Sequence, residues 1–83
     1  MKRNVLITGA VGGIGKSICM SLLKKNNLIL VGRNKNKLDS FLEDHQSVIK
    51  RITCDLRDKA EIKKLYESIV NDELQVDILI NNA

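Results

Sequence analysis

Four glycines lie close together near the start of the chain and are spaced as in a phosphate-binding turn. Gly9, Gly12, Gly13 and Gly15 follow the apolar run 3–8. A tight strand-to-helix turn needs backbone angles that favour glycine, and a phosphate reaches main-chain N–H groups best where no Cβ intervenes. The N-terminus of a following helix adds partial positive charge. The residues expected to hold a phosphate here are Gly9, Ala10, Val11, Gly12, Gly13, Ile14 and Gly15.

The same turn supports a second interpretation, the phosphate-binding loop of nucleoside-triphosphate hydrolases. That loop needs an early glycine followed by Gly-Lys-Ser/Thr, in which the lysine binds the β- and γ-phosphates and the hydroxyl binds Mg²⁺. Lys16 and Ser17 fit the second part, whereas Ala10 stands in place of the early glycine. Asp55 is available as a magnesium-holding acid. On local evidence, a P-loop nucleotide site using Lys16-Ser17 remains the alternative.

Polar residues at the ends of three other predicted strands favour a dinucleotide. Arg33 follows the apolar run 28–31, about twenty residues beyond the glycine turn, where a dinucleotide fold meets the adenosine ribose. An acid there would bind a free 2′-hydroxyl, whereas an arginine offers a fork for a 2′-phosphate. Asp55-Leu56 follows the third strand, and Asn81-Asn82-Ala83 follows the fourth. These residues predict NADP, rather than NAD, as the cofactor.

Taken together, residues 8–15, Asp55-Leu56 and Asn81-Asn82-Ala83 resemble the successive markers of the short-chain dehydrogenase/reductase family. The branch that they resemble most is that of the NADP-preferring 3-oxoacyl-acyl-carrier-protein reductases. The order and spacing match along essentially the whole chain. The resemblance implies that the glycine turn holds the cofactor pyrophosphate.

The resemblance also implies roles at the other strand ends. Arg33 would hold the adenosine phosphate, Asp55 the adenine amino group, and Leu56 would line the adenine pocket. Asn82 would contact the cofactor through its backbone, while Asn81 and Asn82 brace the sheet. The implied cofactor-binding residues beyond the turn are Arg33, Asp55, Leu56, Asn82 and Ala83.

The resemblance stops short of the catalytic residues. Catalysis in this family belongs to a serine and a Tyr-x-x-x-Lys pair, whose tyrosine exchanges a proton with the substrate oxygen and whose lysine lowers the tyrosine pKa. Tyr66 is the one tyrosine, and Val70 stands where the lysine would be. We therefore place Tyr66 in the core and assign no catalytic residue. We expect the N-terminal, dinucleotide-binding portion of an oxidoreductase, inactive alone.

Seven alternating elements are predicted to position these residues. Apolar residues three, four and seven apart indicate helices, and continuous short apolar runs indicate buried parallel strands. The second helix, capped by Asn34 or Asn36, presents a face from Leu38 to His45, and Asp58 with Glu61 resembles a capping box. The strands are expected at residues 3–8, 28–31, 48–54 and 76–80, with helices at about 14–25, 38–45 and 58–70.

This alternation predicts an α/β fold with a parallel sheet. Lys50 and Arg51 interrupt the third strand, as is tolerated at a sheet edge. The order that satisfies this is 3-2-1-4 with three helices, half of a doubly wound Rossmann sheet, so residues 1–83 form an incomplete NAD(P)-binding domain. Strand order reverses between the first and fourth strands, and ligands bind outside the carboxyl ends there.

Half of such a sheet is incompletely covered. Two helices would cover one face and a single helix the other, leaving uncovered a region lined by Val5, Ile7 and strand 76–80. This strand would also form an unprotected apolar edge. We expect weak stability and association, either with a complementary C-terminal reductase fragment or with a second copy through strand 76–80. A non-catalytic interaction module is a further alternative.

Composition argues against several other classes of protein. The net charge of +4 is scattered, and Phe41 and Tyr66 are the only aromatic residues, so no nucleic-acid partner is expected. No apolar run approaches the roughly 18 residues of a membrane span. Cys19 and Cys54 lie in apolar segments, as expected of reduced core residues. These two cysteines form no disulfide framework, so we expect a cytoplasmic protein. His45 has no second ligand at metal spacing, so we expect no metal site.

Overall fold

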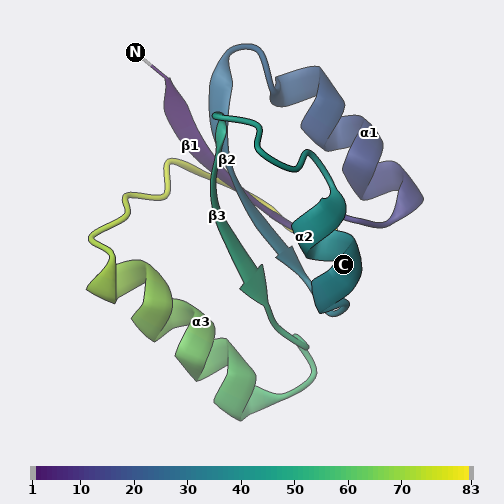
Figure 1. The fold of residues 1–83 in the computed structure, drawn as a ribbon. Helices are drawn as coiled ribbons and strands as arrows, with labels where there is room; N and C mark the ends of the chain where they lie inside the picture. The colour runs from purple at the N-terminus through teal and green to yellow at the C-terminus, as the bar shows by residue number, and fades with distance from the viewer. Residues whose placement is uncertain (1, 83) are drawn as a thin grey trace.

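The computed structural model describes residues 2–82 as a parallel sheet with helices on both faces (Figure 1). The strand order is β3-β2-β1-β4, and every pairing is parallel. This confirms the predicted half of a Rossmann sheet in the order 3-2-1-4. The elements are β1 Arg3–Thr8, α1 Gly13–Leu22, β2 Asn26–Gly32, α2 Lys35–Ser40, β3 Val48–Thr53, α3 Lys59–Asn71 and β4 Ile78–Ile80.

The side chains of β1 alternate between two apolar clusters, one on each face of the sheet. Val5 and Ile7 are fully buried and pack with Cys19 of α1 and Leu38 of α2. Leu6 points to the opposite face, where α3 packs (Figure 1). The expectation that Val5 and Ile7 line the uncovered face is therefore wrong, because the pleat turns both of them toward the two-helix side.

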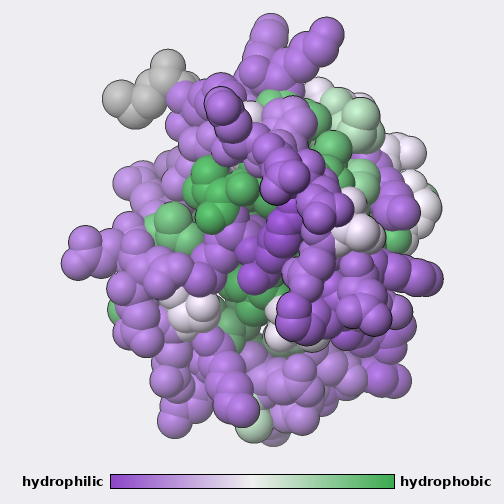
Figure 2. All heavy atoms as spheres, viewed as in Figure 1, coloured by the Kyte–Doolittle hydropathy of each residue, from purple (hydrophilic) through white to green (hydrophobic). Residues whose placement is uncertain are grey.

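The incompletely covered region lies on the α3 side of β4. Leu79 pairs in register with Leu6 and therefore faces the same side of the sheet. Its side chain is 63% exposed, whereas Leu6 is buried. The face of the molecule drawn in Figure 2 is mostly hydrophilic, with separate hydrophobic areas toward its centre. Helix cover on this side thus reaches the inner strands and leaves the β4 edge open.

Helix α3 packs on the sheet with only some of its apolar residues. Leu65 and Ile69 contact the cluster beneath it. Ile62, Tyr66 and Val70 lie four residues apart and form an exposed stripe beside that contact, with Tyr66 68% exposed. The prediction that Tyr66 belongs to the core is wrong, because one helix on an incomplete face turns only a narrow side toward the sheet.

Helix α2 ends earlier than predicted because an arginine from β3 donates hydrogen bonds to the carbonyl groups at and just after its C-terminal end. The Arg51 guanidinium donates to the main-chain oxygens of Leu38, Phe41 and Leu42. Those oxygens include acceptors that a continuing helix would use. Leu42 has a φ of 53°, which breaks the helix. His45, expected on the same helical face, therefore lies in the loop before β3.

The remaining differences from prediction are shifts of element ends, which frequently vary by a residue or two. Asn26 and Asn27 lie between the predicted helix 14–25 and the predicted strand 28–31. In the structure they are the first residues of β2 and pair with Arg3 and Asn4 of β1. The Asn26 side-chain amide also donates to the Leu22 carbonyl at 3.0 Å, where α1 ends. β3 is an edge strand, as the charges at Lys50 and Arg51 predicted.

Candidate functional site

The carboxyl ends of the strands surround a cavity of about 1320 Å³ at the point where strand order reverses. Ala10 and Gly15 do not line it, because both are buried behind the turn. Ala83 lies outside the described residues. The predicted cofactor-binding residues that do line the cavity are Gly9, Val11, Gly12, Gly13, Ile14, Arg33, Asp55, Leu56 and Asn82.

The carbonyl group of Gly9 is the centre of the glycine turn. Gly9 has a φ of 61°, which disfavours residues with a Cβ. Its oxygen accepts from the Gly12 N–H at 3.2 Å. A Cβ on Gly15 would lie 2.0 Å from the same oxygen, so α1 packs directly on the main chain of the turn. A Cβ on Gly13, by contrast, would meet nothing within 4 Å.

The N-terminus of α1 faces the cavity without a side-chain cap. Gly12 is the N-cap residue, and no side chain accepts a hydrogen bond there. The first turn contains no acidic residue. The first N–H groups of a helix have no partner within the helix, and the helix dipole makes this end positive. The turn therefore has the geometry of an anion site, and phosphate binding by its glycines stays a prediction.

Lys16 and Ser17 do not point into this cavity. The Lys16 ammonium lies over the Phe41 ring, 5.5 Å from its centroid. The Ser17 hydroxyl donates to the Gly13 carbonyl at 3.3 Å, within its own helix. Neither side chain lines the cavity. The alternative of a triphosphate loop is therefore not favoured.

Two asparagines tie the end of β4 to the end of β1. The Thr8 hydroxyl donates to Asn81 Oδ1 at 3.0 Å and accepts from the main-chain N–H of Asn82 at 3.0 Å. The Asn82 side-chain amide donates to the Gly9 carbonyl at 3.2 Å. The geometry agrees with the bracing expected of Asn81 and Asn82. It also connects the fourth strand end directly to the glycine turn.

A cationic rim follows β2. Arg33 is exposed at the cavity, and Lys37 lines it from α2. The Asn34 side chain accepts from the Lys37 N–H at 3.1 Å and is thereby the N-cap of α2. Gly32, the last residue of β2, is buried against Val11 and Leu38. The positive charge of the rim therefore lies beside the turn without an acid at the same strand end.

The end of β3 carries an ion pair. The Arg57 guanidinium binds the Asp55 carboxylate, with Nη2 2.9 Å from Oδ2. Hydrogen bonds from the Arg57 side chain and from its main-chain N–H, together with the charges of Arg57 and Arg33, lower the pKa of Asp55 to about 2. The same pair raises the pKa of Arg57. Asp55 is therefore an ionised acceptor across the physiological range.

A family model described as short chain dehydrogenase matches residues 3–83. The chain belongs to the short-chain dehydrogenase family. It is 33% identical over 85 residues to the short chain dehydrogenase/reductase dpfgG of Gibberella zeae, which covers 98% of this chain and 31% of that protein. It is 29% identical over 82 residues to the 3-oxoacyl-(acyl-carrier-protein) reductase FabG of Thermotoga maritima, covering 94% of this chain and 33% of that reductase.

Solved short-chain dehydrogenase structures share the fold. One from Streptomyces avermitilis superposes with a TM-score of 0.83 at 25% identity, over all of this chain and 31% of the other. The 3-ketoacyl-(acyl-carrier-protein) reductase from Brucella melitensis, complexed with NADH, superposes with a TM-score of 0.75 at 23% identity, over 93% of this chain and 32% of the other. This chain thus spans about a third of the length of the relatives that it matches.

Several residues of this short-chain dehydrogenase cavity were not identified from the sequence. Arg57 and Glu61 come from the third crossover, and Lys37 comes from α2. The sequence contained a signal for Lys37, because a helix capped by Asn34 has Lys37 in its first turn, close to the end of the preceding strand. No sequence signal placed the Arg57 side chain on Asp55, because a loop arginine is ordinarily free in solvent.

Both cysteines are free and buried, as predicted. Burial raises the pKa of Cys19 to about 11. The pKa of Cys54 is raised by burial and then by the negative charges of Glu61, Asp55 and Asp58. Both side chains are thus protonated thiols at neutral pH and behave as small apolar core residues.

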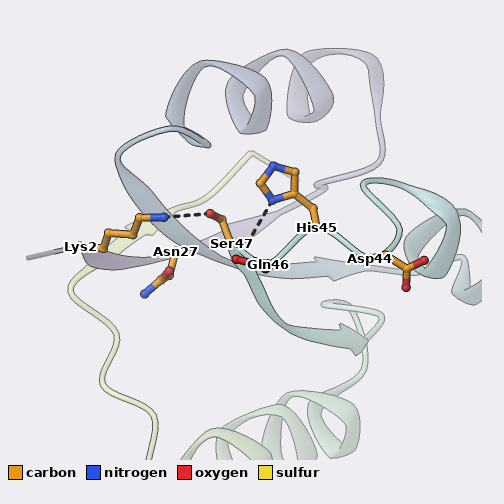
Figure 3. A pocket seen from close by; sticks show the side chains of 6 residues that line it. All are labelled: Lys2, Asn27, Asp44, His45, Gln46 and Ser47. Carbon is orange, nitrogen blue, oxygen red and sulfur yellow. Dashed lines mark hydrogen bonds between the residues drawn. The ribbon is translucent and has the colours of Figure 1, made fainter.

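A second hollow of about 580 Å³ is lined by Lys2, Asn27 and the segment 44–47 (Figure 3). The Lys2 ammonium donates to the Ser47 hydroxyl at 3.1 Å, and the Ser47 N–H donates to Nδ1 of His45 at 3.1 Å. Within residues 2–82, no group of three His, Cys, Asp or Glu side chains is arranged to hold a metal ion. No helix in this part of the chain is long and apolar enough to cross a membrane.

Proposed function

We propose that this chain binds NADP as the dinucleotide-binding portion of a short-chain dehydrogenase-type oxidoreductase. Members of this family use an NAD(P) dinucleotide, which supplies or accepts a hydride when bound. The observation that carries the preference for NADP is Arg33, exposed at the cavity directly after β2, where an acid would instead favour NAD. Lys37 adds a second positive charge to the same rim.

The cavity suits the parts of the dinucleotide in order. The pyrophosphate would lie over Gly12 and Gly13 at the N-terminus of α1, where the main chain is open. The 2′-phosphate would lie at Arg33, and the adenine at Asp55 and Leu56. No residue of this chain is assigned a catalytic role, so we propose that the chain has no reductase activity alone.

Titration of the chain with NADPH and NADH tests the cofactor proposal. Loss of a charge-assisted contact costs about 1.5–3 kcal/mol, so Arg33→Ala is expected to weaken NADPH binding about 10- to 100-fold and to leave NADH binding nearly unchanged. Arg3→Ala is the matched control, because Arg3 is an exposed arginine at the start of β1, at the end of the sheet opposite the cavity. Tighter binding of NADH by the unaltered chain, or an unchanged preference in Arg33→Ala, would contradict the proposal.

We further propose that the open β4 edge associates with a complementary C-terminal reductase fragment or with a second copy of the chain. The position of β4 at the edge of the sheet and the exposure of Leu79 support this proposal. Sedimentation with and without a fragment containing the residues that follow in the relatives distinguishes the two partners. A monomer under both conditions would exclude both partners.

The free, buried cysteines support a cytoplasmic location for the protein.

A further inference from the structure

Arg57 occupies most of the hydrogen-bonding capacity of Asp55. Oδ1 of Asp55 accepts from the Arg57 main-chain N–H at 3.0 Å and from its Nε at 3.1 Å. Oδ2 accepts from Nη2 of Arg57 at 2.9 Å. Each carboxylate oxygen has two lone pairs, so Oδ1 is filled and Oδ2 retains a single acceptor position.

The main chain of Asp55 is held as well. Its N–H donates to Oε1 of Glu61 at 3.0 Å, which ties the end of β3 to the first turn of α3. The carboxylate cannot rotate without losing the two-point contact with Arg57. Asp55 therefore offers one acceptor in one orientation, beside the cavity that it lines.

Arg57 itself contributes nothing to the core. Its side chain is 78% exposed, whereas that of Asp55 is 29% exposed. An exposed ion pair adds little to folding stability. The pair lies between neighbouring residues of one loop and joins no two elements of the fold. Its consequence is thus the orientation and the charge of Asp55 at the cavity.

We infer that Arg57 is a positioning residue that makes the base end of the cavity selective for a 6-amino purine over a 6-oxo purine, an inference that rests on the proposed dinucleotide site. The remaining Oδ2 position of Asp55 accepts a hydrogen bond from an exocyclic amine. A carbonyl oxygen at the same place on the base has no proton to donate and is repelled by the carboxylate. Arg57 acts through Asp55 and does not itself contact the base.

The test compares NADPH with its hypoxanthine analogue, which carries oxygen in place of the amino group and, as a lactam, a proton on N1 of the base. Both ligands have the same 2′-phosphate, so the ratio of their dissociation constants reports on the base alone. The dissociation constant of the hypoxanthine analogue divided by that of NADPH measures the selectivity. Arg57→Ala is expected to reduce this ratio about tenfold, the effect of one charge-assisted hydrogen bond. Arg57→Lys keeps the charge without the fork and is expected to restore part of the ratio. Arg3→Ala is expected to leave the ratio unchanged.

The possible outcomes separate this inference from the proposed function. Failure of the unaltered chain to bind either dinucleotide would overturn the proposed function and the inference together. Binding with the same ratio in Arg57→Ala as in the unaltered chain would overturn the inference alone. An equal loss of affinity for both ligands in Arg57→Ala would also overturn the inference, because Arg57 would then bind the phosphates directly.

Titration of the Asp55 carboxyl by NMR gives a readout that needs no ligand. The lowered pKa of Asp55, about 2, means that the small contribution of this exposed ion pair to folding stability is present above pH 3.8 and is lost as the pH falls toward 2. In Arg57→Ala the pKa is expected to rise toward the ordinary value of 3.8. An unchanged pKa in that variant would contradict the positioning role.

Discussion

At the glycine turn the cavity wall is main chain, whereas at the ends of β2 and β3 it is made of charged side chains. Gly9 supplies its carbonyl group and a positive φ, and α1 begins beside it without any side-chain cap. Arg33, Asp55 and Arg57 shape the other end and are partly or largely exposed. Substitutions in the turn should therefore change folding or access to the main chain, whereas substitutions at the other end should change selectivity.

The largest expected effect is that of Gly15→Ala. The new Cβ would lie 2.0 Å from the Gly9 oxygen and 2.9 Å from the Gly9 carbonyl carbon, both of them main-chain atoms that cannot rotate away. Overpacking of this kind costs about 1–3 kcal/mol and occasionally more, a large share of the stability of a small domain. Urea unfolding followed by circular dichroism is expected to show a lower midpoint. An unchanged midpoint would contradict the close contact.

Gly13→Ala should affect binding and leave stability unimpaired. A Cβ there meets nothing within 4 Å, and alanine favours helix more than glycine does. The methyl group would enter the space proposed for the pyrophosphate, so NADPH affinity is expected to fall roughly tenfold, about 1.4 kcal/mol. Calorimetric titration beside urea unfolding separates the two quantities. Unimpaired affinity in a stable variant would move the pyrophosphate away from Gly13.

The smallest of these effects is expected for Asp58→Ala, which tests a helix start made by a side chain. Asp58 accepts from the Ala60 N–H at 2.9 Å and from the Glu61 N–H at 3.4 Å. Loss of such a cap costs about 1 kcal/mol. Thermal unfolding should show this loss, with Asp58→Asn as the control that keeps an acceptor. Equal losses in both variants would contradict capping as the cause.

The order of the strands could be predicted from the sequence because the composition of each strand indicates whether it lies at the centre or at the edge of the sheet. The run Leu28–Val31 is buried on both faces, and the charges at Lys50 and Arg51 belong to an edge strand. The end of α2 could not be predicted, because the guanidinium that stops it comes from β3. The exposure of Tyr66 likewise depends on how far α3 extends over the sheet, and helical spacing carries no information on that distance.

By itself, the sequence determined the α/β alternation, the half-Rossmann strand order, the glycine turn and membership of the short-chain dehydrogenase family. These follow from local spacing and from backbone angles that only certain residues adopt. The tertiary structure alone decided that Lys16 turns away to Phe41 and that Arg57 holds Asp55. It also decided that Leu79 lies open. Long side chains and sheet faces contact residues that are far apart in the sequence. Many residues are possible partners for each of them, and only the folded arrangement selects one.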